Sequence, residues 1–297
     1  MRPDLEELIR HAKDRGLRAV ISTNGTLITE KRAHRLSELG LSYVGVSLDG
    51  LEDTHDTFRR VPGAFKKALE GIRNSMAAGI KVGLRLTINR ENREEIPGIF
   101  HLLEEEGVPR ICFYHLVVTG RGTSLHDSLL THDETREALD TIIDETKKLY
   151  DRGLEPEVLT VDNHADGPYL YLRLLGENPD RADEVLRLLM RNRGNSSGVG
   201  IGCISWDGTV YADQFWRNRP LGSVRERPFS AIWTDPDHPL LSRLRNKKLF
   251  VTGRCATCRW LDICAGNFRA RAEAMTGDTW ASDPVCYLTD EEIARPA

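Results

Sequence analysis

The sequence predicts an α/β protein built around a parallel sheet. Short apolar runs that close on turn residues alternate with amphipathic helical stretches at a spacing of about 30 residues, which is typical of βαβ units. Gly, Asn and Asp residues gather directly after these runs, where parallel sheets and barrels carry their binding loops. Four strands of this kind are expected in the first half of the chain.

Helices and strands alternate through residues 1–155. A first helix is expected to start at Pro3, which suits the first helical turn, and to end at Gly16. Strands are expected, in chain order, at residues 17–23, 43–48, 82–88 and 111–117. Further helices are expected, in chain order, at residues 30–39, 64–78, 94–106 and 133–150. Residues 1–155 are therefore expected to form one α/β domain.

The second half of the chain changes character. Residues 156–200 contain one expected helix, at about 169–193, which is followed by a Gly- and Ser-rich boundary loop. Residues 201–211 have the pattern of a hairpin that turns at Asp207-Gly208. The last part of the chain is rich in Cys, Arg and Gly and has a weak core of its own. We expect a metal to stabilise this last domain, residues 201–297.

Composition excludes several classes of protein. Of the 297 residues, 40% are hydrophobic and 29% are charged, a mixture typical of a folded globular chain. The net charge of −4 gives no general attraction for nucleic acid or anionic membranes. No apolar run approaches the roughly 18 residues of a membrane helix, and the first residues lack the apolar stretch of a signal peptide. We therefore expect a cytoplasmic protein with no nucleic-acid or membrane partner.

The strongest chemical signal is a cysteine array near the C-terminus. Cys255, Cys258, Cys264 and Cys286 follow the spacing C-x2-C-x5-C-x21-C. A two-residue gap lets two thiolates reach one metal centre from a tight turn, and the other two complete a four-thiolate shell. Spacing alone fits a zinc ion and a [4Fe–4S] cluster equally well, and free structural cysteines are the plainer alternative.

The chain resembles the radical S-adenosylmethionine (SAM) enzymes with a SPASM extension, and within them the heme-pathway group that includes NirJ and AhbC. The general resemblance lies in the cysteine array and in STNGTL at 22–27, VSLDG at 46–50 and HDTFR at 55–59. The subgroup resemblance lies in FYHLVVTGRG at 113–122, SWDGTVYADQ at 205–214 and PLGSVR at 220–225. It covers essentially the whole chain.

The resemblance implies a fold and a cofactor. The fold would be an incomplete parallel (β/α)6 partial TIM barrel with a C-terminal Cys-rich SPASM-type Fe–S extension. The four array cysteines would hold one auxiliary [4Fe–4S] cluster rather than zinc. Members with two auxiliary clusters carry further cysteines where this chain has Asp213 and Phe268, so one is expected here. Cys203 is either a core thiol or a residue facing the substrate or cluster.

The family motif C-x3-C-x2-C, which binds the cluster that cleaves SAM, does not occur in the sequence. We expect a shortened form of a longer enzyme, with the first strand and the cluster loop missing. SAM and a second [4Fe–4S] cluster would belong to the full-length parent. The chain as given is expected not to cleave SAM, and a non-catalytic Fe–S or metal-binding protein is an alternative.

Five residues are expected to bind SAM in the parent enzyme. Asn24, Ser47 and Asp49 lie just past strands, where polar side chains could meet the ribose and methionine of SAM. Their alternative role is turn chemistry, because Asn-Gly and Asp-Gly close turns without a ligand. Arg85 and Asn89 belong to the next strand and the loop after it. An arginine inside an apolar run needs an anion such as the SAM carboxylate.

Three residues are candidates for catalysis or substrate contact. Tyr114, His115 and Arg121 lie at the end of the last expected strand, and in this family that strand end faces the cavity below the Cys-rich cap. Cationic and imidazole groups suit a substrate with several carboxylates and an iron. Three nearby aromatic residues could flank a flat macrocycle, but core packing is the preferred interpretation for Trp206, Phe215 and Trp216.

The resemblance implies an enzyme of tetrapyrrole biosynthesis. The parent reaction would be the radical removal of a propionate or an acetate from didecarboxysiroheme, on the way to heme d1 or heme. The sequence does not choose between the two. A ferredoxin or flavodoxin would supply electrons. A peptide-modifying SPASM maturase is the runner-up.

Overall fold

The computed structural model describes residues 2–294. The chain divides into two compact units. The first contains the residues up to His115 together with Glu134–Val161, and the second contains Leu116–Asp133 together with the residues from Asp162 onward. None of the described helices is long and apolar enough to span a bilayer.

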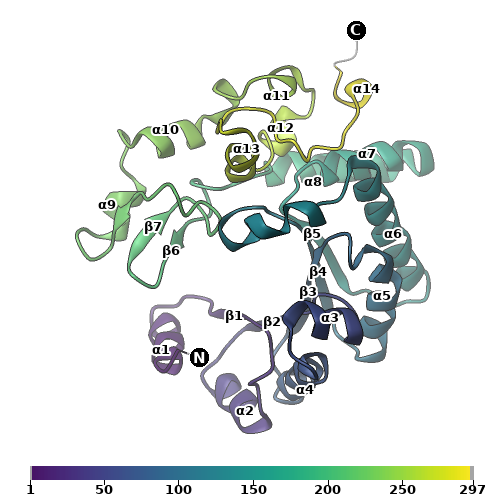
Figure 1. Cartoon of the computed structure of the whole chain (residues 1–297), viewed down its shortest axis with the longest axis vertical. Coiled ribbons are helices and arrows are strands. Elements are labelled where there is room, and N and C mark those ends of the chain that lie inside the picture. Colours follow the sequence, from purple (N-terminus) through teal and green to yellow (C-terminus); the bar gives the residue numbers. More distant parts are fainter. Residues whose placement is uncertain (1, 295–297) are drawn as a thin grey trace. The chain divides into compact units, whose positions relative to one another are not determined.

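The first unit is a parallel five-stranded sheet whose strands lie side by side in chain order (Figure 1). The strands are β1 (Val20–Thr23), β2 (Tyr43–Ser47), β3 (Val82–Ile88), β4 (Arg110–His115) and β5 (Glu157–Val161). The helices are α1 (Leu5–Asp14), α2 (Glu30–Glu38), α3 (Glu52–Arg59), α4 (Ala64–Ala77), η1 (Arg93–Glu95), α5 (Ile96–Glu105) and α6 (His132–Asp151). The predicted α/β class and parallel sheet are confirmed.

Side chains alternate between the two faces of this sheet. One face is apolar and packs under helices: Phe113 of β4, for example, stacks on Phe100 of α5 with ring centroids 5.5 Å apart. The opposite face carries the polar residues of the same strands, since Ser47, Arg85 and Cys112 are register partners across β2, β3 and β4. The sheet therefore separates a structural face from a face with chemically useful groups.

The expected count of four strands was one short. β3 has the predicted bounds, but β5 was not expected. It begins at the exposed Glu157, directly after Pro156, and its other residues are only half-buried at an edge of the sheet. The helix α3 was also missed. Its eight residues are polar apart from Phe58, so no apolar stripe marked them as helical.

The single helix expected at about 169–193 is in fact two helices, α7 (Asp166–Glu177) and α8 (Pro179–Asn192). Pro179 cannot continue a helix from the residues before it, but it suits the first position of a new one. Asn178 caps α8, because its side chain accepts a hydrogen bond from the backbone N–H of Arg181.

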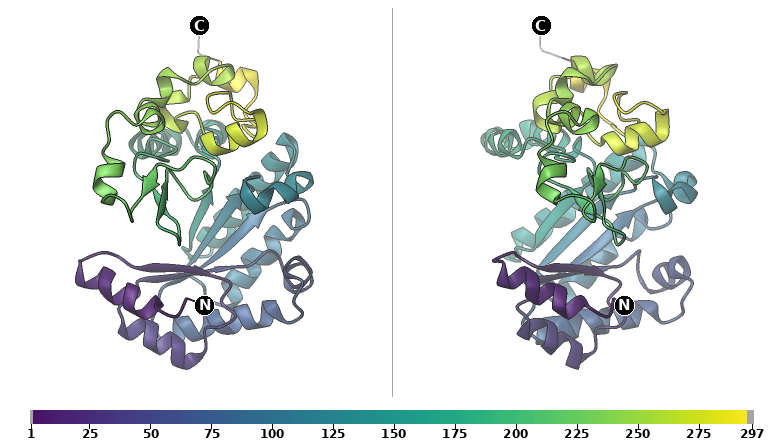
Figure 2. Two further views of the ribbon diagram at one scale, coloured as in Figure 1. Left: turned by 60° about the vertical axis from the view of Figure 1, so that its left-hand side comes forward. Right: turned by 90° about the vertical axis from the view of Figure 1, so that its left-hand side faces the viewer.

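The rest of the second unit consists of short elements, and those after residue 200 are drawn from green to yellow (Figure 2). The predicted hairpin is confirmed as β6 (Cys203–Ile204) and β7 (Thr209–Tyr211), and β8 (Gly222–Ser223) extends it. The short helices are η2 (Gly120–Ser128), α9 (Phe229–Trp233), α10 (Pro239–Arg245), η3 (Lys247–Leu249), α11 (Arg254–Thr257), α12 (Leu261–Cys264), α13 (Arg269–Thr276) and α14 (Asp290–Ile293).

A hydrophobic core joins the hairpin to the Cys-rich segment. Trp216, which is 1% exposed, packs with Val210 of the hairpin and with Phe268 and Ala270 near the C-terminus. The last residues of the chain therefore share a core with the hairpin, in keeping with the weak core of their own that the sequence predicts.

Candidate functional site

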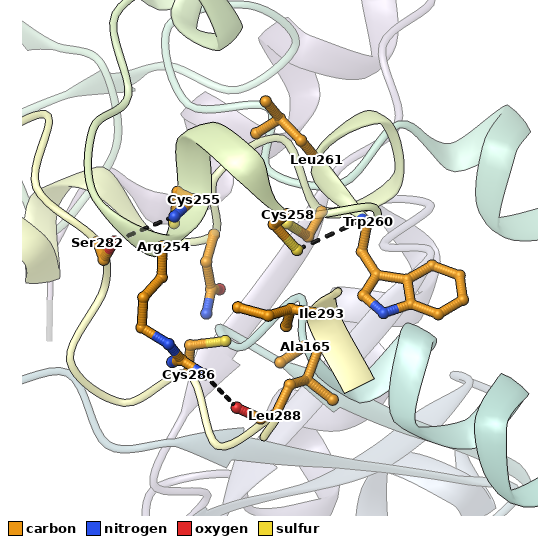
Figure 3. A pocket seen from close by; sticks show the side chains of 12 residues that line it. Ala165, Arg254, Cys255, Cys258, Trp260, Leu261, Ser282, Cys286, Leu288 and Ile293 are labelled. Carbon is orange, nitrogen blue, oxygen red and sulfur yellow. Dashed lines mark hydrogen bonds between the residues drawn. The ribbon is translucent and has the colours of Figure 1, made fainter. Parts of the chain in front are cut away.

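The four cysteines of the array line one cavity in the second unit. Figure 3 labels three of them, Cys255, Cys258 and Cys286. Cys255 lies in α11, Cys258 directly follows that helix, Cys264 ends α12, and Cys286 lies in the loop before α14. The rest of the wall is mostly apolar, from Ala165, Trp260, Leu261, Leu288 and Ile293, with Arg254, Asn267 and Ser282 as its polar members. All six cysteines of the chain are free thiols, so no disulfide competes for these four.

Backbone amides point at the sulfur atoms. The N–H of Trp260 donates to Cys258 Sγ over 3.4 Å (Figure 3). The backbone amides of Gly266 and Leu288 lower the pKa of Cys264 and of Cys286, against the effect of burial. Hydrogen bonds of this kind stabilise thiolates and help to set the potential of an iron–sulfur cluster.

Burial keeps these thiols protonated in the absence of a metal. Loss of hydration raises the pKa of Cys264 to about 12 and that of Cys286 to about 11, and it also raises the pKa of Cys258. Each thiolate would further oppose the ionisation of its neighbours. A metal centre would displace the protons, so its binding would release protons to solvent.

The chemistry of the donor set suits an iron–sulfur cluster. Within residues 2–294, no three His, Cys, Asp or Glu side chains are drawn closely enough together to ligate one metal ion. Zinc needs four thiolates at about 2.3 Å from one centre, whereas a [4Fe–4S] cube is wider and its ligands stand farther apart. Four thiols around one largely apolar cavity supply the all-sulfur donor set that such a cluster uses.

Asp213 and Phe268 are occupied by structural contacts. The carboxylate of Asp213, 2% exposed, accepts the backbone N–H groups of Phe215 and Trp216. Phe268 is buried, and its ring meets that of Phe215 edge-on at 5.3 Å. Cys203 is half-buried on β6 and does not line the thiol cavity.

Two of the expected SAM residues lie together on the polar face of the first unit. Ser47 and Arg85 are register partners on β2 and β3, and the Arg85 guanidinium lies 4.3 Å from the ring centroid of Tyr114 on β4. Gly45 makes room for this arginine, because a Cβ there would come within 2.6 Å of Arg85 Cδ. No carboxylate of the described residues pairs with Arg85, so its charge remains available for an anion.

The side chains of the other three expected SAM residues already have partners within the first unit. The Asp49 carboxylate pairs with Arg59 Nε. Asn24 Oδ1 accepts from the backbone N–H of Thr26 over 3.3 Å, and Asn89 Oδ1 accepts from that of Glu91 over 2.9 Å. The Asn24 contact matches the turn chemistry that the sequence left open for this residue, and a role of all three residues in binding SAM stays a prediction.

The expected catalytic residues are placed separately. Tyr114 and His115 end β4 in the first unit, where both are half-buried. Arg121 belongs to η2 in the second unit, and its side chain lies outside the described residues.

Core packing was the wrong interpretation for one of the three aromatic residues. Trp216 is buried as expected and Phe215 packs against the core, but Trp206 is 80% exposed at the hairpin turn. The guanidinium of Arg217 lies over Trp206, 5.3 Å from its ring centroid, and also 5.5 Å from that of Tyr211. Arg217 Nη1 donates to Ser205 Oγ over 2.7 Å, which holds it in place. The alternative role for Trp206, an aromatic face that could flank a macrocycle, therefore stays a prediction.

His55 of α3 is expected to make stability depend on pH. The ring is 1% exposed, its Nδ1 accepts the Asp49 N–H over 3.0 Å, and burial lowers its pKa below 6.5. As the pH falls below about 6.5, the unfolded chain takes up a proton that the folded ring refuses, so stability decreases. His55→Asn keeps an acceptor and is expected to flatten this decrease in the thermal midpoint between about pH 6.5 and 5. His101→Asn, at an exposed site, is the control, and an unchanged slope for His55→Asn would contradict the assignment.

Comparisons with known proteins agree with the family that the sequence motifs indicate. The model of the radical SAM superfamily matches residues 1–103. Fe-coproporphyrin III synthase of Methanosarcina barkeri is 60% identical over 296 residues, which cover 99% of this chain and 74% of that protein. Pre-heme d1 synthase of Dinoroseobacter shibae is 40% identical over 294 residues, which cover 98% and 72%. AdoMet-dependent heme synthase of Nitratidesulfovibrio vulgaris is 31% identical over 309 residues, which cover 96% and 76%.

Two solved structures share the fold. The chain anSMEcpe, with bound AdoMet and Cp18Cys peptide, matches with a TM-score of 0.68 and 19% identity over 95% of this chain and 75% of that chain. SuiB of Streptococcus suis, bound to its precursor peptide SuiA, matches with a TM-score of 0.72 and 16% identity over 96% and 62%.

The parallel sheet and these relatives define the class of protein. The chain belongs to the radical SAM superfamily, in the group that contains Fe-coproporphyrin III synthase, pre-heme d1 synthase and AdoMet-dependent heme synthase. The resemblance to the heme-pathway group is therefore confirmed. Membership implies a [4Fe–4S] cluster and SAM as the cofactors of the family.

Proposed function

We propose that the chain is the SAM- and substrate-handling part of a radical SAM enzyme of heme biosynthesis, with an iron-bearing, polycarboxylated tetrapyrrole as its substrate. The observation that carries the proposal is its identity to Fe-coproporphyrin III synthase over nearly the whole chain, which is well above its identity to pre-heme d1 synthase. This difference favours removal of acetates from didecarboxysiroheme, giving iron coproporphyrin, over removal of propionates on the heme d1 route.

The proposed architecture follows the family. Residues 1–155 would be part of a (β/α)6 barrel, and residues 201–297 would be a SPASM-type extension joined to it by residues 156–200. Cys255, Cys258, Cys264 and Cys286 would hold one auxiliary [4Fe–4S] cluster, as their common cavity supports. When bound, the family's SAM-cleaving cluster and SAM supply a carbon radical that abstracts hydrogen from the substrate, with electrons from a ferredoxin or flavodoxin.

The polar face of the first unit supports a role in binding SAM. The Arg85 guanidinium is held in place by the Tyr114 ring, is half-buried, and has no carboxylate partner in the described part of the chain. A carboxylate such as that of the SAM methionine would pair with it. Ser47 lies beside Arg85 on β2 and offers a hydroxyl to the same ligand.

The cationic aromatic surface of Trp206, Arg217 and Tyr211 supports a role in binding tetrapyrrole. An exposed indole offers a flat apolar face to a macrocycle. A guanidinium fixed over two rings offers charge to a carboxylate at its edge. Arg217 has no carboxylate partner among the described residues, in contrast to Arg227, whose Nη2 lies 3.2 Å from Asp235 Oδ2.

Binding of iron coproporphyrin, the expected product, tests the proposal. We expect the chain with its cluster loaded anaerobically to shift the porphyrin absorbance at micromolar concentrations. Arg217→Ala should weaken this binding by about 1.5–3 kcal/mol, or roughly 10- to 150-fold, through loss of a charge-assisted hydrogen bond. Arg227→Ala, whose charge is already paired, is the control.

Two results would count against this function. The absence of any spectral change at high micromolar porphyrin would contradict binding of tetrapyrrole. Saturable binding of a peptide in place of porphyrin would favour the peptide-modifying alternative.

A further inference from the structure

Two buried cations near the thiol cavity have no acidic partner. Arg269 is 0% exposed, and its guanidinium donates only to backbone carbonyls, those of Gly266, Thr279 and Ala281. Lys247 is 5% exposed, and its ammonium donates to the carbonyl and side-chain oxygens of Asn195. Within residues 2–294, neither cation has a carboxylate at ion-pair distance.

The two acidic residues that attract these cations, Asp283 and Asp213, already have other partners. Asp283 is fully buried and binds Arg271, whose Nη2 lies 2.8 Å from Asp283 Oδ2. Asp213 attracts Lys247 from beyond ion-pair distance, and its carboxylate caps a backbone turn. Burying a charge without a partner is costly, so two such cations in one region call for a further anion.

Both cations are tied to the peptide around Cys264. The Gly266 carbonyl accepts from Arg269 Nη2, and Gly266 lies two residues after Cys264 in the chain. On the other side, the Asn195 N–H donates to the Cys264 carbonyl over 3.4 Å, and the Asn195 carbonyl accepts from Lys247 Nζ. Each cation is thus hydrogen-bonded to a residue that adjoins Cys264, either along the chain or through its backbone carbonyl.

The close approach of the Asn195 loop depends on a glycine. A Cβ at Gly194 would come within 2.5 Å of the Cys264 carbonyl carbon and oxygen, and Gly194 has a φ of +66°. Any other residue would push the loop, and the Lys247 anchor with it, away from Cys264. The position of the buried ammonium is therefore set by the backbone.

We propose that Arg269 and Lys247 are the counter-charges of the iron–sulfur cluster in the thiol cavity, and that they raise its reduction potential. The inference rests on the proposed cluster at Cys255, Cys258, Cys264 and Cys286. Four thiolates leave a [4Fe–4S] centre with net negative charge, and one electron from an external one-electron donor adds another negative charge. Fixed cations nearby stabilise the reduced form more than the oxidised form.

Redox titration of the loaded chain, followed by optical and EPR spectra, tests this role. We expect Arg269→Gln to lower the equilibrium constant for reduction about tenfold, which is a downward shift of about 59 mV for one electron. Lys247→Met is expected to shift it in the same direction. Arg269→Lys, which keeps the charge, should restore most of the potential. A merely structural role of both Arg269 and Lys247 would leave the potential unchanged in all three variants.

Arg259→Gln is the matched control. Arg259 is exposed and lies next to Cys258 in sequence, so solvent screens its charge. Loss of this charge should shift the reduction potential by less than about a third of the shift expected for Arg269→Gln. If Arg269→Gln fails to keep its cluster, Lys247→Met decides the question alone. A loaded protein whose potential is the same in Arg269→Gln and Lys247→Met overturns the inference but leaves the cluster intact. A wild-type chain that binds no iron and sulfide overturns the proposed cluster itself.

Discussion

Replacing Cys264 by serine is expected to remove most of the iron and sulfide that the chain binds on anaerobic reconstitution. Cys264 ends α12, and its thiol is one of four that line a single cavity. A cluster that loses one of its four thiolates is held weakly, and the binding energy that it adds to folding is lost with it. Iron and sulfide analysis should therefore give less than about half of the wild-type content, and the thermal midpoint of the loaded protein should fall.

Cys203→Ser is the matched control for this experiment. Cys203 is also a half-buried free thiol of the second unit, but it does not line the cavity. Its loss should leave the iron content unchanged. Normal iron in Cys264→Ser would exclude it as a ligand. About eight irons per wild-type chain would contradict the single auxiliary cluster, and zinc without sulfide would replace the cluster by a structural ion.

The second large effect is expected at the buried pair of Arg271 and Asp283. Both side chains are 0% exposed, and two guanidinium nitrogens of Arg271 bind the carboxylate. The same carboxylate accepts the backbone N–H groups of Phe268 and Val285, so it fixes the segment between Cys264 and Cys286. Arg271→Met leaves the buried Asp283 carboxylate without its cationic partner. The substitution should therefore lower the free energy of unfolding of this unit by about 3–5 kcal/mol.

Denaturant unfolding of the loaded protein measures this loss. Asp283→Asn removes the charge but keeps an acceptor, so the double variant should be more stable than Arg271→Met alone. Arg227→Met, which breaks an exposed ion pair with Asp235, is the control and should cost about 0–1 kcal/mol. A cost for Arg271→Met within the range of this control would show that Asp283 does not need its partner.

The central strands could be predicted from the sequence because buried strands consist mostly of apolar residues. β3 is an apolar run with Gly and Asp or Asn at its borders, and its predicted bounds match the structure. β5 was missed because it lies at an edge of the sheet, where half of its residues need not be apolar. The break between α7 and α8 was marked by Asn178-Pro179, but the apolar residues on both sides continue at helical spacing across it.

The thiol cavity could be predicted because cysteine spacing is a local property of the chain. The buried arginines around the cavity could not be predicted from the sequence. Arg269 and Arg271 alternate with alanines in α13, and arginines in such a pattern are expected on a solvated surface. Their burial depends on carbonyl groups from distant loops and on Asp283, which only the folded chain brings together. Trp206 was misplaced for the opposite reason, since an aromatic residue beside a hairpin turn is expected to be buried.

The two-faced sheet of the first unit has a consequence for how such a protein can diversify. Arg85 and Tyr114 alternate along β3 and β4 with Leu84, Leu86 and Phe113, which point to the opposite, helix-covered side. Substitution of Arg85 or Tyr114 changes which ligand the polar face can bind. It leaves the packing of the three apolar side chains against the helices unaffected. Ligand preference and folding stability thus depend on alternate residues of the same strands, so selection can change the ligand without disturbing the core.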